Sequence, residues 1–101
     1  MGEFVRVAGT EDVKPGQGIV AEVNGKTLAI FNVNGEFRAI DNTCLHRGGP
    51  LGEGDVEGNV VTCPWHGWQF DVTTGACVNN PSAKVEVYDV RVEGTDVKVL
   101  L

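Results

Sequence analysis

Apolar and polar residues alternate along much of this chain with a period of two, which is typical of half-buried β-strands rather than amphipathic helices. The alternating and β-branched runs predict strands at residues 4–7, 19–23, 27–31, 36–40, 84–92 and 97–101. Shorter candidates fall at residues 60–62, 68–71 and 76–78. Because Gly, Pro, Asn and Asp separate these runs, we expect short strands joined by tight turns.

Two Asn-Gly pairs mark turns in the first half of the chain. Asn24-Gly25 separates the second and third predicted strands, and Asn34-Gly35 separates the third and fourth. Asn and Gly tolerate the positive φ angles that a type I′ hairpin turn requires. The pairs therefore predict a three-stranded antiparallel meander, preceded by a loop at 10–18 that contains one helical turn.

The C-terminal part returns to regular alternation and predicts a closing hairpin. The alternation of residues 84–92 changes parity near Asp89, which we interpret as a β-bulge. Residues 93–96, with the sequence Glu-Gly-Thr-Asp, then turn the chain into the last strand. Short antiparallel strands with frequent turns predict an all-β fold, an antiparallel sandwich or small barrel.

The stretch from about residue 41 to residue 82 has a different composition. It is rich in Gly, Pro, Cys, His and Trp, with only short strand candidates. A chain of 101 residues is expected to form one domain, residues 1–101. We therefore interpret residues 41–82 as a binding region inserted into a β scaffold.

Charge and hydropathy exclude several classes of function. Eight Lys and Arg against 14 Asp and Glu give a net charge of −6, with no basic stripe, so nucleic acid is not an expected partner. No apolar run approaches the roughly 20 residues that span a bilayer, and the first residues lack the pattern of a signal peptide. We expect a cytoplasmic protein without a membrane anchor, whose acidic surface favours a basic partner.

The chemistry of the chain is concentrated in two Cys/His pairs. Cys44-Leu45-His46 is followed, after residues 47–62, by Cys63-Pro64-Trp65-His66, and these are the only two histidines. Three cysteines do not suggest a disulfide framework, whereas two matched Cys/His pairs predict one metal site. Two thiolates and two imidazoles suit zinc or an iron–sulfur cluster. The single residue between Cys44 and His46 favours the cluster, since the two ligands then reach different metal atoms more easily than one.

Residues 44–51 and 63–71 resemble the two cluster-binding boxes of the Rieske [2Fe–2S] family, and the surrounding strands and turns match over nearly the whole chain. The resemblance implies a Rieske-type sandwich with an inserted cluster-binding subdomain and one [2Fe–2S] cluster. It also implies that Cys44 and Cys63 bind one iron, and that His46 and His66 bind the other, nearer the surface. Neutral imidazoles raise the reduction potential above that of an all-cysteine cluster.

The chain departs from the high-potential members of that family. Those proteins carry a disulfide where this chain has Gly49 and Trp65, and hydroxyl side chains where it has Trp68 and Phe70. Fewer hydrogen bonds to the cluster sulfurs stabilise the reduced state less. The sequence therefore predicts a potential at the low end of the Rieske range. Cys77, outside both boxes, is interpreted as a small buried apolar residue.

The resemblance to small stand-alone Rieske ferredoxins implies a one-electron carrier, not itself an enzyme. Such carriers link a flavin-dependent reductase to a terminal oxygenase that hydroxylates aromatic compounds, docking through the surface near His46 and His66. An oxygenase catalytic subunit would need further histidines for a mononuclear iron. A nitrite reductase small subunit and a structural zinc module remain as alternatives.

Overall fold

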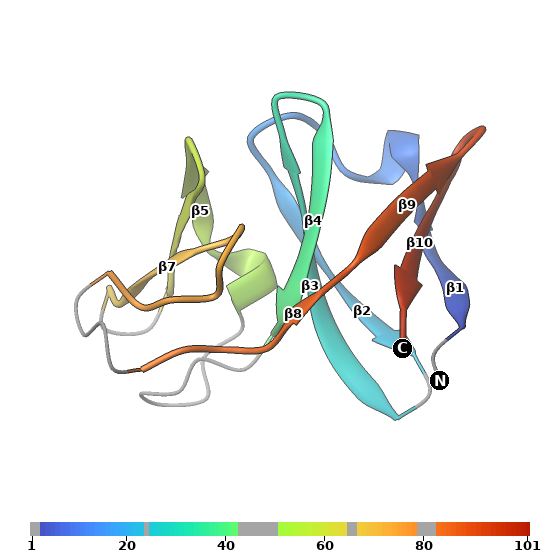
Figure 1. Cartoon of the computed structure of the whole chain (residues 1–101). Coiled ribbons are helices and arrows are strands. Elements are labelled where there is room, and N and C mark those ends of the chain that lie inside the picture. The colour runs from blue at the N-terminus through green and yellow to red at the C-terminus, as the bar shows by residue number, and fades with distance from the viewer. Residues whose placement is uncertain (1–2, 24, 43–50, 65–66, 79–82) are drawn as a thin grey trace.

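The computed structural model describes residues 3–23, 25–42, 51–64, 67–78 and 83–101. Their strands form three antiparallel sheets (Figure 1). The first sheet, in the order β1-β10-β9, contains β1 (Phe4–Gly9), β9 (Val90–Glu93) and β10 (Asp96–Leu100). The second, β2-β3-β4-β8, contains β2 (Gly18–Val23), β3 (Lys26–Val33), β4 (Glu36–Asp41) and β8 (Val87–Tyr88). The third, β5-β6-β7, contains β5 (Asp55–Glu57), β6 (Val60–Thr62) and β7 (Gln69–Asp71).

The second sheet is the shared middle layer of the fold. Its strand β3 is buried on both faces, and its side chains alternate between two hydrophobic clusters. Ala29 and Phe31 join the cluster on the side of β5-β6-β7, whereas Leu28 and Ile30 join the cluster beneath β1-β10-β9. Because successive side chains of a strand point to opposite faces, one apolar strand can supply two cores.

The all-β prediction and the antiparallel meander are confirmed. β2 pairs with β3 and β3 with β4, in continuous register. At the second predicted turn, Asn34 has φ +53° and Gly35 has φ +91°, both in the left-handed region that a type I′ turn uses. The helical turn expected in the first loop is η1 (Thr10–Asp12).

The closing part of the chain differs from the prediction of one bulged strand over residues 84–92. β8 pairs with β4 in the middle sheet, whereas β9 pairs with β10 in the first sheet. The parity change near Asp89 therefore marks the passage from one sheet to the other rather than a bulge. The candidate strand 76–78 forms only isolated bridges, between Cys77 and Phe70 and between Ala76 and Lys84.

The predicted insertion lies between two neighbouring strands of the middle sheet. Ala39 and Ile40 of β4 pair with Tyr88 and Val87 of β8, although the two strands are far apart in the sequence. Between them the chain forms η2 (Leu51–Glu53) and the small sheet β5-β6-β7, which Figure 1 places beside the larger sheets. The pairing of β4 with β8 thus holds the residues before and after the insertion side by side.

Candidate metal centre

Of the four predicted ligands, Cys63 lies within the described residues, and Cys44, His46 and His66 lie outside them. Cys63 directly follows β6, is 1% exposed, and forms no disulfide. Within the described ranges, no three His, Cys, Asp or Glu side chains come together as a metal site. Among the predicted ligands, Cys63 is therefore the one whose surroundings the structure describes.

The β6–β7 hairpin fixes the position of Cys63. Thr62 pairs with Gln69, and the Gln69 amide also donates a hydrogen bond to the Thr62 hydroxyl, 3.3 Å. One step further, the Cys63 N–H donates to the Trp68 carbonyl at 2.6 Å. Gly67, with φ +74°, supplies the left-handed conformation in the connection that these bonds close. The backbone position of the residue with the buried thiol is thus fixed by the pairing of β6 with β7.

Two further segments of the chain are closed at their bases by backbone hydrogen bonds between described residues. The Leu51 N–H donates to the Asn42 carbonyl at 2.7 Å, across residues 43–50. The Cys77 N–H donates to the Ala83 carbonyl at 3.0 Å, across residues 78–82. These bonds fix where each segment leaves and rejoins the scaffold.

One hydrophobic cluster joins the bases of all three segments. Its fully buried members include Leu51, Cys63, Phe70 and Cys77, and the half-buried Trp68 packs against it. The apolar role expected for Cys77 is therefore confirmed. A buried cysteine thiol in this dry environment suits an iron–sulfur cluster, whose thiolate ligands need protection from water.

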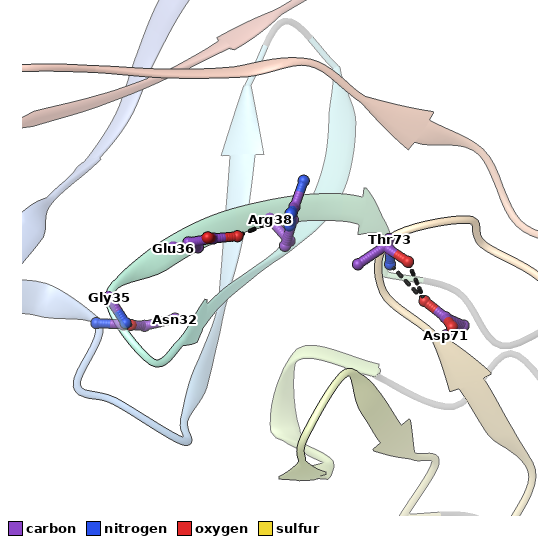
Figure 2. Close-up of polar contacts among 6 residues, drawn as sticks. All are labelled: Asn32, Gly35, Glu36, Arg38, Asp71 and Thr73. Carbon is purple, nitrogen blue, oxygen red and sulfur yellow. Dashed lines mark hydrogen bonds and ion pairs between the residues drawn. The ribbon is translucent and has the colours of Figure 1, made fainter.

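Asp71, the last residue of the second box, forms a compact turn with Thr73 (Figure 2). The Thr73 N–H donates to the Asp71 carboxylate at 2.8 Å, and the Thr73 hydroxyl donates to the same oxygen at 2.5 Å. Burial acts to raise the pKa of Asp71, but the hydrogen bonds from Thr73 outweigh it and hold that pKa below its ordinary value. The Asp71 carboxylate is therefore ionised at neutral pH and can accept both hydrogen bonds from Thr73.

Tyr88 links the strand before the first box to the strand after the insertion. Its hydroxyl donates to the Asp41 carboxylate at 2.9 Å, while the Lys26 ammonium lies 5.6 Å from the ring centre. Burial, together with this hydrogen bond and the Asp41 charge, raises the pKa of Tyr88 to about 12. This pair could not be predicted from the sequence, because no local pattern connects two residues so far apart.

The raised pKa gives a direct test. Because the folded pKa lies above the ordinary value of 10.0, the Tyr88–Asp41 contact stabilises the fold fully below pH 10 and is lost as the pH rises through about 12. As the chain has one tyrosine, tyrosinate absorbance measured against the Tyr88→Phe variant should titrate near 12. Asp41→Asn should move the midpoint down, and a wild-type midpoint near 10 would contradict the contact.

No described helix is long and apolar enough to cross a membrane.

Comparisons with known proteins agree with this geometry. The family model described as "Rieske [2Fe-2S] domain" matches residues 3–96. The biphenyl dioxygenase ferredoxin subunit of Pseudomonas sp. (strain KKS102) is 37% identical over 98 residues, which cover 95% of this chain and 90% of that protein.

Solved structures show the same fold. The ferredoxin solved in complex with the oxygenase of carbazole 1,9a-dioxygenase superposes with a TM-score of 0.85 at 33% identity, covering 95% of this chain and 91% of that one. A chain from Mycobacterium tuberculosis assigned as an NADH-dependent nitrite reductase small subunit gives a TM-score of 0.92, covering 100% and 96%. Its identity is only 22%, so that likeness concerns the fold alone.

Proposed function

Because the chain belongs to the Rieske [2Fe–2S] domain family, we propose that it is a one-electron carrier that delivers electrons to a terminal oxygenase. It carries one Rieske-type [2Fe–2S] cluster, as its ferredoxin relatives indicate. The single observation that carries the proposal is the 37% identity to a dioxygenase ferredoxin over 95% of this chain. When bound, the cluster takes up and releases one electron without forming or breaking bonds to a substrate.

We propose that Cys44 and Cys63 hold one iron, and that His46 and His66 hold the other. Two observations support this assignment: the spacing of the two Cys/His pairs, and the burial of the Cys63 thiol at the closed end of the β6–β7 hairpin. The residues of this chain would exclude water from the thiolates and hold the two ligand-bearing segments on one core. The whole chain, 1–101, would then be a single domain with its cluster-binding region at about 41–82.

The partners proposed for this chain are a flavin-dependent reductase and a terminal oxygenase, met transiently in the cytoplasm. A ferredoxin 33% identical to this chain was solved in complex with its oxygenase, which supports the second partner. Docking would use the surface near His46 and His66, because electron transfer falls off steeply with distance. The net charge of −6 suits basic partner surfaces and predicts transfer rates that fall as salt is raised.

The proposal is tested by reconstituting electron flow with a reductase and oxygenase from a Rieske-type dioxygenase system. We expect NADH and reductase to reduce the oxidised protein by one electron per chain, and the oxygenase then to reoxidise it. Omitting the ferredoxin should stop product formation. A protein that the reductase does not reduce, but that forms a stable complex with a nitrite reductase catalytic subunit, would favour the alternative function.

The family match favours the cluster over the structural zinc module. The nitrite reductase alternative has weaker support, since its relatives share the fold at 22% identity or less in the structures compared.

The reduction potential provides a separate prediction. Trp68 and the fully buried Phe70 have no hydroxyl to donate to the cluster sulfurs. We therefore expect a midpoint near the lower end of the Rieske range, about −150 mV rather than +300 mV. A dye-mediated potentiometric titration followed by visible absorbance checks this value. A clearly positive midpoint would show that other donors replace the missing hydroxyls.

A further inference from the structure

Two buried polar side chains stand out among the described residues, Asn32 at 5% exposed and Asn42 at 8%. A buried amide is costly unless its hydrogen bonds are satisfied, so each position has a structural reason to be polar. Asn32 lies within the β3–β4 hairpin. Asn42 comes directly after β4 and two residues before the first predicted ligand, Cys44.

Asn42 forms a clamp across residues 43–50. Its carbonyl accepts the Leu51 N–H at 2.7 Å, and its side-chain Oδ1 accepts the next N–H, that of Gly52, at 2.8 Å. The two bonds tie the residue before the segment to two consecutive residues after it. An alanine at position 42 would keep the first bond and lose the second.

Both sides of this clamp are anchored to the middle sheet. On one side, the Asn42 N–H donates to the carbonyl of Thr27, a residue of β3, at 3.2 Å. On the other, a Cβ added to Gly52 would lie 2.7 Å from the Ile19 carbonyl oxygen and 2.8 Å from Val20 Cγ2, so η2 presses its backbone against β2. The clamp therefore joins two parts of the scaffold that can hardly shift.

We infer that Asn42 is a positioning residue for the cluster: by holding the base of residues 43–50 closed, it sets the placement of Cys44 and His46 relative to Cys63. The inference rests on the ligand assignment under Proposed function. Hydrogen bonds outside the ligand shell orient the ligands and tune their affinity for the metal. A clamp that opens lets the segment that carries two of the four ligands move, which favours release of iron.

Asn32 offers a matched control within the same sheet. Its Oδ1 accepts the Gly35 N–H at 2.7 Å (Figure 2). Its Nδ2 donates to the Val13 carbonyl at 2.9 Å. It therefore clamps a turn with the same kind of bond as Asn42. Because Asn32 closes the β3–β4 turn, whereas Asn42 closes the segment with the ligands, only Asn42 should influence the cluster.

The experiment compares iron release from Asn42→Ala and Asn32→Ala holoproteins. Release to an excess of a ferrous chelator under reducing conditions is followed for each protein at the same interval below its own Tm. We expect release from Asn42→Ala to be about tenfold faster than from wild type, about 1.4 kcal/mol on the barrier. Asn32→Ala should stay within about twofold of wild type.

A spectroscopic signature and a conservative variant separate positioning from loss of stability. The EPR spectrum of reduced Asn42→Ala should be broadened by a spread of ligand geometries, whereas that of Asn32→Ala should match wild type. Asn42→Asp keeps an oxygen to accept the Gly52 N–H and should restore slow release. If Asn42→Ala does not fold, Asn42→Ser, whose shorter side chain leaves Gly52 without its acceptor, is measured in its place.

Equal release rates for the two alanine variants would overturn the role of Asn42 while a Rieske EPR spectrum of the wild type still upheld the ligand assignment. A wild-type spectrum without Rieske character would overturn both, so the two failures are distinguishable.

Discussion

Replacing Cys63 by alanine is expected to abolish the iron–sulfur cluster, and replacing Cys77 by alanine is expected to leave it intact. The two residues are a matched pair, since both are 1% exposed, both are free of disulfides, and both belong to the same hydrophobic cluster. Each substitution removes one buried sulfur atom and leaves a similar small cavity. Only Cys63 lies in a predicted ligand pair, so only its loss should remove a bond to iron.

Visible absorbance, together with iron and acid-labile sulfide per chain, measures this difference. Cys77→Ala should retain about two irons per chain, the content of a [2Fe–2S] cluster, and Cys63→Ala close to none. Circular dichroism establishes that both variants are folded. A Cys63→Ala protein that keeps its colour and sulfide, or a colourless Cys77→Ala protein, would contradict the assignment of ligands.

Gly75→Ala should be among the most destabilising single substitutions in this fold. Gly75 lies in the turn after β7 with φ +78°, and a Cβ there would lie 2.2 Å from the Val85 carbonyl oxygen and 2.8 Å from Val87 Cγ2. The Gly75 N–H donates to the Asp71 carbonyl, and its own carbonyl accepts the Val85 N–H. An added methyl group would therefore force apart backbone that is held by hydrogen bonds on both sides.

We expect Gly75→Ala to lower the free energy of unfolding by more than about 3 kcal/mol, a large part of the roughly 5–15 kcal/mol typical of a domain. Gly94→Ala is the control, because Gly94 has φ +62° but no atom within 4 Å of an added Cβ. It should cost only the strain of the left-handed conformation, about 1–2 kcal/mol. Urea unfolding followed by circular dichroism compares the two, and equal losses would contradict the close approach at Gly75.

The scaffold was largely predictable from the sequence because its signals are local. Alternation of period two and the Asn34-Gly35 pair predicted the meander, and the turn at residues 93–96 predicted the closing hairpin. The strand β5 was missed because Asp55 and Glu57 leave one apolar residue in a three-residue run. The Gly58-Asn59 pair before β6 was the turn signal that could have revealed it.

Long-range relations could not be predicted in the same way. The alternation of residues 84–92 is identical whether one strand bends or the chain passes between two sheets, and pairing with β4 and β10 decides between them. The clamp at Asn42 was missed too. A signal was available in the alternation of side chains along β4. Asn42 lies two residues after the buried Ile40, so its side chain is expected on the same face of the sheet and therefore buried.

The site shows a similar division. The two Cys/His pairs predicted the chemistry because metal ligands are recognisable by residue type and spacing. The contacts that hold the ligand-bearing parts of the chain in place could not be predicted. They are the Cys63–Trp68 bond, the Asn42 clamp and the shared hydrophobic cluster, and they depend on the folded structure rather than on a local sequence pattern. Of the predicted ligands, Cys63 has a described position, and the coordination by Cys44, His46 and His66 stays a prediction.

The central claim, a [2Fe–2S] cluster held by two cysteines and two histidines, is tested most directly by EPR spectroscopy of the anaerobically purified protein after reduction with dithionite. We expect a rhombic signal whose mean g value lies below that of an all-cysteine [2Fe–2S] cluster, because two imidazoles replace two thiolates on one iron. A mean g value typical of all-cysteine ligation, or an EPR-silent colourless protein that contains zinc and no acid-labile sulfide, would contradict it.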